Sequence, residues 1–100
     1  MKLWIDDVRP APDGYVWCKS VNEVRSFIAA WELLTNESME LIDLDYDSGD
    51  YEKDGGPYIK LMDWLVERGT LYPLTFHSQN CVGMEYMKRM YRRYWLKESL

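Results

Sequence analysis

Polar side chains that suit phosphate and metal chemistry lie in three short stretches of the sequence. Each stretch directly follows an apolar run, and the three read Asp6-Asp7, Asp45-x-Asp47 and His77-Ser78-x-Asn80. Short apolar runs of this kind predict buried strands. In a mostly parallel sheet the carboxyl ends of the strands share one edge, which is where α/β proteins bind their ligands. We therefore expect the three stretches to form one site.

The acidic residues indicate a divalent cation. Neighbouring carboxylates in a half-buried cleft repel each other, which raises their pKa values or destabilises the fold unless a cation neutralises them. Mg²⁺ and Mn²⁺ prefer such oxygen ligands, and Mg²⁺ is commonly held by one or two carboxylates with waters and phosphate oxygens. The predicted ligands of Mg²⁺ or Mn²⁺ are Asp6, Asp7 and Asp45, with Asp47 as a competing ligand. The alternative is that some of these acids only cap turns or solvate loop ends.

The stretch around His77 can bind phosphate and transfer a proton. It precedes a predicted helix, whose first-turn amides would face the acids, and helix N-termini bind phosphate in this way. Ser78 and Asn80 can add donors, although a helix N-cap explains Asn80 equally well. His77 is the only histidine of the chain, and imidazole titrates near neutral pH, which suits proton transfer to a leaving oxygen. Arg9 can hold a phosphate in a bidentate manner, or it pairs with a nearby acid.

Strands and helices that would position these residues alternate along the chain. Strands are predicted at 3–5, 15–19, 39–45 and 72–76. Helices are predicted from the S-x-x-E capping box at 20–23 to residue 34, from Pro57 to Gly69, and after residue 80 to about residue 97. This order favours an α/β sandwich around a mostly parallel sheet. The loop at 9–14 is too short for an ordinary crossover helix, so the direction of the 15–19 strand stays open.

Composition indicates one domain, residues 1–100, because two separate cores would each be too small to fold without disulfides or metals. Hydrophobic residues make up 47% of the chain, which is enough to fill one core. The two cysteines, Cys18 and Cys81, favour free thiols and a cytoplasmic protein. Acids at positions 6 and 7 argue against a signal peptide or membrane span at the start of the sequence.

The formal net charge of −5 gives no general attraction to nucleic acid or to a membrane. A local exception is the last predicted helix, which carries Lys88, Arg89, Arg92, Arg93 and Lys97. A solvated face is the commoner explanation of such a helix, and an acidic partner or an RNA backbone is the alternative. The sequence has no Ser-His-Asp order, Walker loop, CxxC pair or HExxH motif, which excludes those chemistries.

Three motifs, in this order, resemble the cyclic-phosphate processing receiver domain family. They are Leu-Trp-Ile-Asp-Asp-Val-Arg-Pro at 3–10, Leu-Asp-Tyr-Asp at 44–47 and His-Ser-Gln-Asn-Cys-Val-Gly-Met at 77–84. That family is a divergent branch of the receiver domains of response regulators. The resemblance implies a compact flavodoxin-like, three-layer sandwich of about four mostly parallel strands and three helices. It also implies an acidic metal-binding pocket made by Asp6, Asp7 and Asp45, to which the family adds polar residues at 47, 77, 78 and 80.

The sequence departs from an ordinary receiver domain in three respects. It has no strand-end lysine to contact a phosphorylated aspartate, which disfavours a phosphorelay. The loop at 8–14 replaces the receiver's first helix. Tyr46 stands where we expect the family to prefer histidine, which disfavours a mechanism with two histidines.

We therefore predict a metal-dependent hydrolase of phosphate esters, a phosphodiesterase or phosphohydrolase acting on cyclic or terminal phosphates. Its substrate would be a small molecule or a nucleic-acid end that carries phosphate. The predicted catalytic residues are His77, Asp47 and Ser78; the phosphate-binding residues are Arg9, Ser78 and Asn80; the metal ligands are Asp6, Asp7 and Asp45. The alternative is a non-catalytic receiver-like module that accepts phosphate on Asp45 or binds a partner protein. No membrane partner is expected, and the oligomeric state is left open.

Overall fold

Four parallel strands form one sheet in the order β2-β1-β3-β4 in the computed structural model, which describes residues 1–98. The strands are β1 (Lys2–Ile5), β2 (Tyr15–Cys18), β3 (Leu41–Leu44) and β4 (Leu74–Phe76). Ile5 pairs with Cys18 and Leu44, and Leu44 pairs with Phe76, so the last residues of all four strands lie in one row. The polar residues that follow β1, β3 and β4 therefore start from the same edge of the sheet.

Strand β2 runs parallel to β1, which settles the direction that the sequence left open. Residues 6–14 make the connection without a helix and are held by two indole groups. The Nε1 of Trp4 donates to the carbonyl of Arg9 at 3.0 Å, and that of Trp17 donates to the carbonyl of Asp6 at 2.8 Å. Gly14, at φ +87°, makes the turn into β2.

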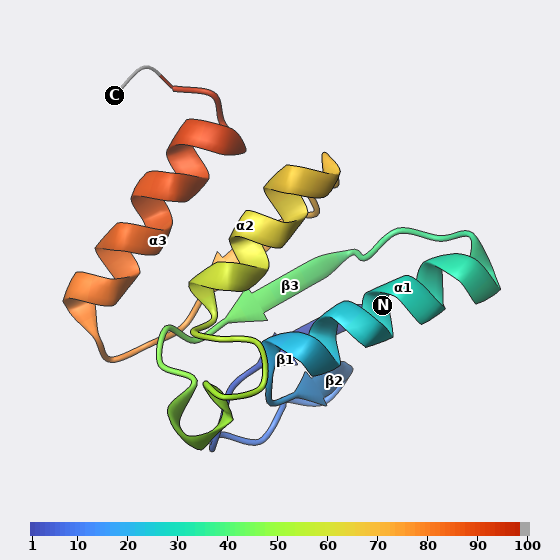
Figure 1. The fold of residues 1–100 in the computed structure, drawn as a ribbon, viewed down its shortest axis with the longest axis horizontal. Helices are drawn as coiled ribbons and strands as arrows, with labels where there is room; N and C mark the ends of the chain where they lie inside the picture. The colour runs from blue at the N-terminus through green and yellow to red at the C-terminus, as the bar shows by residue number, and fades with distance from the viewer. Residues whose placement is uncertain (99–100) are drawn as a thin grey trace.

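The three helices α1 (Val21–Thr35), α2 (Ile59–Arg68) and α3 (Cys81–Tyr94) lie on one face of the sheet, in front of it in Figure 1. Two crossovers, from β2 to β3 and from β3 to β4, move in the same direction across the sheet, and right-handed crossovers then place their helices on one side. The receiver-like α/β class, the parallel sheet and the three helices are confirmed. The expected third layer is not present in residues 1–98, because the β1–β2 connection that would carry a helix on the other face is a loop.

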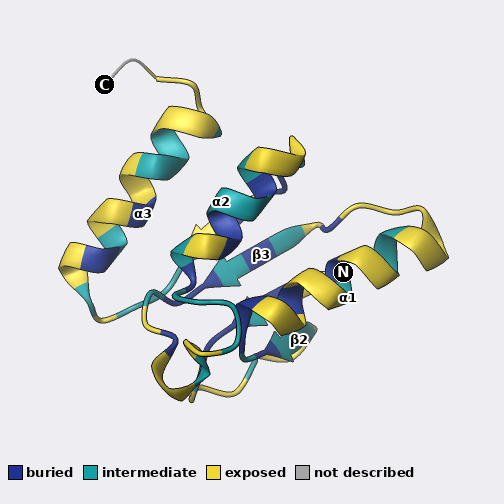
Figure 2. Ribbon diagram, in the orientation of Figure 1, coloured by how far each residue is buried: buried dark blue, intermediate teal, exposed yellow. Residues whose placement is uncertain are grey.

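The core lies between the helices and this face of the sheet (Figure 2). Strand residues Leu3, Ile5, Ile42 and Leu44 alternate towards the helices and are fully buried. They pack against apolar residues of α1 and α2, among which Val24, Ile28, Leu61, Met62 and Leu65 have no exposed surface. Helix α3 contributes less to the core, and Met87 is its fully buried side chain.

Helix boundaries agree with the sequence signals at α1 and differ at the other two helices. The hydroxyl of Ser20 accepts from the Glu23 amide at 3.0 Å, as the capping box predicts. Helix α2 begins at Ile59, two residues after Pro57, and ends as predicted at Gly69, which has φ +73°. Helix α3 ends at Tyr94, short of residue 97, because the chain leaves the helical conformation and Lys97 adopts φ +56°.

Among the described residues, no helix combines the length and the apolar character needed to cross a membrane.

Gly83 lets the ring of Tyr46 lie directly against the first turns of α3. A Cβ atom added at Gly83 would overlap that ring. We expect Gly83→Ala to lower the free energy of unfolding by about 1–3 kcal/mol, measured in urea, because the ring or the helix must move. In a Tyr46→Ala background the same change should be neutral or stabilising by up to about 1 kcal/mol, since alanine is the better helix former. Equal losses in both backgrounds would contradict this packing.

Candidate functional site

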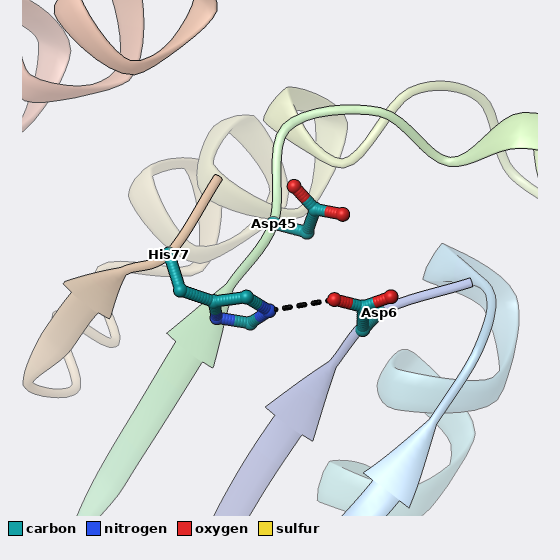
Figure 3. A group of neighbouring side chains, drawn as sticks. All are labelled: Asp6, Asp45 and His77. Carbon is teal, nitrogen blue, oxygen red and sulfur yellow. Dashed lines mark hydrogen bonds and ion pairs between the residues drawn. The ribbon is translucent and has the colours of Figure 1, made fainter. Parts of the chain in front are cut away.

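Asp6, Asp45 and His77 converge at the carboxyl edge of the sheet (Figure 3). They directly follow β1, β3 and β4, and one ligand atom of each lies within 4.8 Å of the others. The sheet ladder extends into the site, because Asp45 N donates to the Ile5 carbonyl at 2.9 Å and His77 N to the Leu44 carbonyl at 2.8 Å. Asp6 is fully buried and Asp45 is 7% exposed. One residue of each predicted stretch thus reaches this edge of the sheet, and the roles predicted for the stretches stay predictions.

The carboxylate of Asp6 is fixed by three donors. Its Oδ1 accepts the amides of Val8 at 2.9 Å and Arg9 at 2.7 Å, and its Oδ2 lies 2.8 Å from Nε2 of His77. Burial is the strongest single influence and raises the pKa of Asp6, but the bonds from Arg9, Val8 and His77 together outweigh it and lower that pKa. Asp6 is therefore a buried, ionised group in a set orientation.

His77 is held between two carboxylates and an indole ring. Its Nδ1 lies 2.6 Å from Oδ1 of Asp43, and its Nε2 contacts Asp6. Burial alone lowers the pKa of His77, yet the hydrogen bonds and charges of Asp43 and Asp6 outweigh it and raise that pKa. Two acceptors call for a proton on each ring nitrogen, which is the imidazolium form. This cation stacks on Trp4 at a centroid distance of 3.6 Å and an interplanar angle of 7°.

Asp43 is a site residue that the sequence prediction missed. It lies inside β3 and not at a strand end. Its neighbours Ile42 and Leu44 are buried under the helices, so its side chain points to the opposite face of the sheet. The register explains its contacts, because Asp43 pairs with Trp4 on one side and with Thr75, two residues before His77, on the other. The sequence signal that could have found Asp43 is the presence of an acid within the otherwise apolar run 41–44.

Asp7 lies close to the cluster but outside the group of three. Burial is the largest influence that raises the pKa of Asp7, and the charges of Asp6 and Asp45 raise it further. Its carboxylate lies against Gly49, where an added Cβ would overlap Oδ2. Gly49 opens the short 3-10 helix η1 (Gly49–Tyr51) at φ +54°, a conformation that favours glycine.

Comparison with known families agrees with this geometry: the model of the cyclic-phosphate processing receiver domain matches residues 1–93. The chain belongs to this family. No curated protein and no solved structure matches the chain.

The other predicted site residues of this receiver domain are Arg9, Asp47, Ser78 and Asn80. Asn80 is the N-cap of α3, since its Oδ1 accepts the Gly83 amide at 2.9 Å. Ser78 closes the preceding turn by accepting the Asn80 amide at 3.1 Å. Asp47 and the side chain of Arg9 are exposed, and the backbone amide of Arg9 donates to Asp6. Their assignment as catalytic or phosphate-binding residues therefore stays a prediction.

The donor set of this receiver domain fits a hard divalent cation. Within residues 1–98, no lysine or arginine forms an ion pair with Asp6, Asp7 or Asp45, and His77 is the cation in contact. Oδ1 of Asp45 accepts the Tyr46 amide at 2.7 Å, and none of the described groups donates to its second oxygen. His77 would have to give up the Nε2 proton and its bond to Asp6 in order to bind a metal. Asp6, Asp45 and the nearby Asp7 could thus hold such a cation without the loss of that proton.

The charged contacts of His77 predict a specific pH dependence of stability in the metal-free domain. The raised pKa of His77 contributes stability that is complete below its ordinary value of 6.5 and is lost as pH rises through the higher folded value. The lowered pKa of Asp6 contributes stability that is present above its ordinary 3.8 and is lost as pH falls through the folded value. Urea unfolding with a chelator should show the largest difference between the wild-type and His77→Gln domains from about pH 4 to 6.5. A difference that does not change between pH 5 and 9 would contradict the ion pair.

Proposed function

We propose that this receiver domain is a metal-dependent hydrolase of phosphate esters that acts on cyclic or terminal phosphates. The observation that carries the proposal is His77, which is oriented by Asp43 and directed at Asp6 beside the free oxygen of Asp45. A proton donor next to a cation site is the pair of features that cleavage of a phosphate ester requires.

Asp6 and Asp45, assisted by Asp7, would hold Mg²⁺ or Mn²⁺. Such an ion, when bound, neutralises phosphate oxygens and makes the phosphorus easier to attack. As the oxygen of water adds to phosphorus and the ester P–O bond breaks, the Nε2–H of His77 would leave Asp6 and protonate the leaving oxygen. The proton lost by the attacking water passes to solvent, from which Nε2 regains its proton. Asp43 keeps its hydrogen bond to Nδ1, which fixes the direction of the ring and stabilises its charged form.

Arg9 is the predicted phosphate clamp with the best support. Its amide is tied to Asp6 at 2.7 Å, while its guanidinium is exposed and forms no ion pair within residues 1–98. Ser78 and Asn80 already accept hydrogen bonds in the turn before α3, so their contribution to phosphate binding would come from groups other than those oxygens. The catalytic role predicted for Asp47 has less support, because its side chain is exposed.

The direct test is turnover of a 2′,3′-cyclic nucleotide by the full chain in Mg²⁺ or Mn²⁺, followed by ³¹P NMR. We expect a ring-opened monophosphate and no reaction in the presence of a chelator. Lack of turnover with either ion would refute the enzyme. Acetyl phosphate is the second arm, because a hydrolysable acyl phosphate on Asp45 would indicate the non-catalytic receiver module. That module has less support, since none of the described lysines pairs with Asp45 to stabilise a phosphorylated side chain.

A further inference from the structure

Helix α3 concentrates positive charge in a protein whose formal net charge is −5. It carries four of the chain's 12 lysine and arginine residues, namely Lys88, Arg89, Arg92 and Arg93. Within residues 1–98, none of these four forms an ion pair with an acid, whereas Arg68 and Lys60 on α2 each do. The positive charge of α3 is therefore available to an anionic partner.

Exposed tyrosines flank these basic residues along the helix. Tyr86 is 60% exposed and Tyr94 is 37% exposed. Tyr86, Arg89 and Arg93 are three or four residues apart, so they share one side of the helix. Figure 2 shows that the outer side of α3 is mostly exposed. The guanidinium of Arg93 lies 5.3 Å from the centroid of the Tyr94 ring. Tyr86 beside Arg89 therefore offers the more accessible ring for stacking next to a cation for phosphate, which is how proteins hold single-stranded nucleic acid.

Two adjoining hollows follow this side of α3 and share Tyr86 and Arg89. One, of 500 Å³, reaches the start of the helix and is also lined by Tyr46 and Cys81. The other, of 270 Å³, extends to the far end of the helix, where it is lined by Arg93 and Tyr94. Tyr46, which lines the first hollow, directly follows the predicted ligand Asp45 in the chain.

Two acids line the same hollows as Arg89 and Arg93, and Lys60 beside one of these acids leaves one net positive charge. Glu85 lines the first hollow and Asp63 the second, and Asp63 is 3.8 Å from the amine of Lys60. The helix dipole favours cations in the last turn of any helix and so accounts for Arg92 and Arg93. It does not account for Arg89 in the middle of the helix or for the exposed ring of Tyr86.

We infer that the stripe formed by Tyr86, Arg89, Arg93 and Tyr94 binds a single-stranded nucleic acid whose phosphate end enters the candidate site. The inference rests on the proposed function for the identity of that end, but the binding itself depends only on α3. A polypeptide rich in acids could pair with the arginines, but it would gain little from the tyrosine rings.

The test measures binding of a fluorescein-labelled single-stranded RNA to the full chain by anisotropy at low salt. We expect the affinity to fall steeply with salt and Arg89→Gln with Arg93→Gln to weaken binding at least about tenfold. The matched control, Arg25→Gln with Lys53→Gln, removes the same charge from exposed positions elsewhere and should change the affinity less than threefold, about 0.7 kcal/mol. No binding at low salt, or equal losses in the two double variants, would overturn the inference.

Stacking separates a nucleic acid from other polyanions. Tyr86→Ala should weaken RNA binding at least about fivefold, and Tyr86→Phe should restore it, since the ring does the stacking. Polyglutamate that competes for the same arginines with no dependence on Tyr86 would identify an acidic protein partner and refute the nucleic acid. Cys81 offers an independent footprint, because it is exposed at the start of α3, whereas Cys18 is buried with its pKa raised to about 12. Bound RNA should slow modification of Cys81 by a thiol reagent.

The same RNA separates this inference from the proposed function. An Asp45→Asn domain should still bind the strand, since the stripe on α3 is unchanged. RNA binding without turnover would support the inference and refute the hydrolase, whereas turnover of a mononucleotide without RNA binding would do the reverse.

Discussion

Replacing Asp45 with asparagine should raise the Kd for Mn²⁺ at least about 100-fold while the fold stays intact. Loss of a group that only supports a ligand costs about 10–100-fold in metal affinity, so loss of a direct carboxylate ligand should cost at least the upper value. The amide oxygen of asparagine can keep the 2.7 Å bond from the Tyr46 amide. The neutral NH₂ group would replace the negative charge of Asp45, which removes the repulsion between Asp45 and Asp7.

Thermal or urea unfolding measures both effects of Asp45→Asn. At a Mn²⁺ concentration of 100 times the wild-type Kd, the wild type should gain about 2.7 kcal/mol of stability and the variant about 0.4 kcal/mol. Without metal, the variant should be at least as stable as the wild type. Asp13→Asn is the matched control, because Asp13 is an exposed acid of the β1–β2 loop with no predicted role at the site, and this variant should lose no Mn²⁺-dependent stability. A full metal response in Asp45→Asn would remove Asp45 from the ligand set.

Asp6 is a poorer position for the same test, although the sequence predicts it as an equal ligand. Its Oδ2 receives a hydrogen bond from His77, and the NH₂ of an asparagine would face the proton on Nε2. Asp6→Asn should therefore destabilise the metal-free domain, and the loss of metal binding would then be mixed with loss of structure.

Most of the fold follows from local patterns in the sequence. The short apolar runs, the capping box at Ser20 and Gly69 at the end of α2 predicted the strands and two helix ends, because each depends on the chemistry of a few adjacent residues. The direction of β2 did not follow from such signals, since it depends on two indole hydrogen bonds across the loop at 6–14. The presence of helices on one face only did not follow either. It depends on the connection from β1 to β2 having no helix while the later crossovers have one, which is a property of the whole topology.

The residues of the candidate site also divide into those that the sequence predicts and those that need the fold. Asp6, Asp45 and His77 were predictable because all three follow strands whose carboxyl ends share an edge. Asp43 was not, because its role appears only when the register places it between Trp4 and Thr75 on the face that receives His77. Asn80 was predicted equally as a cap and as a ligand, and the hydrogen bond to the Gly83 amide shows the cap.

His77→Ala should lower kcat for a cyclic nucleotide by about 10²–10⁴-fold, the usual contribution of a positioned general acid. The Kd for Mn²⁺ should change less than about threefold, because both ring nitrogens of His77 already bind carboxylates and offer no lone pair to a metal. Asp43→Asn should lower kcat by a smaller factor, since its amide oxygen can still accept from Nδ1 but lacks the charge that stabilises the imidazolium. Thr75→Val is the control on the same face, where Thr75 pairs with Asp43 and is exposed.

The comparison of kcat with metal affinity decides which role His77 has. A parallel loss of Mn²⁺ binding in His77→Ala would make His77 a third ligand with Asp6 and Asp45, a geometry that their ligand atoms, all within 4.8 Å, also permit. In His77→Ala, added imidazole can bind against Trp4, where the His77 ring of the wild type stacks at a centroid distance of 3.6 Å. It should restore part of kcat if the lost function is proton donation. Unchanged kcat in His77→Ala would show that His77 is not the general acid. Its raised pKa would then matter for stability alone, and the leaving oxygen of the phosphate ester would take its proton from water.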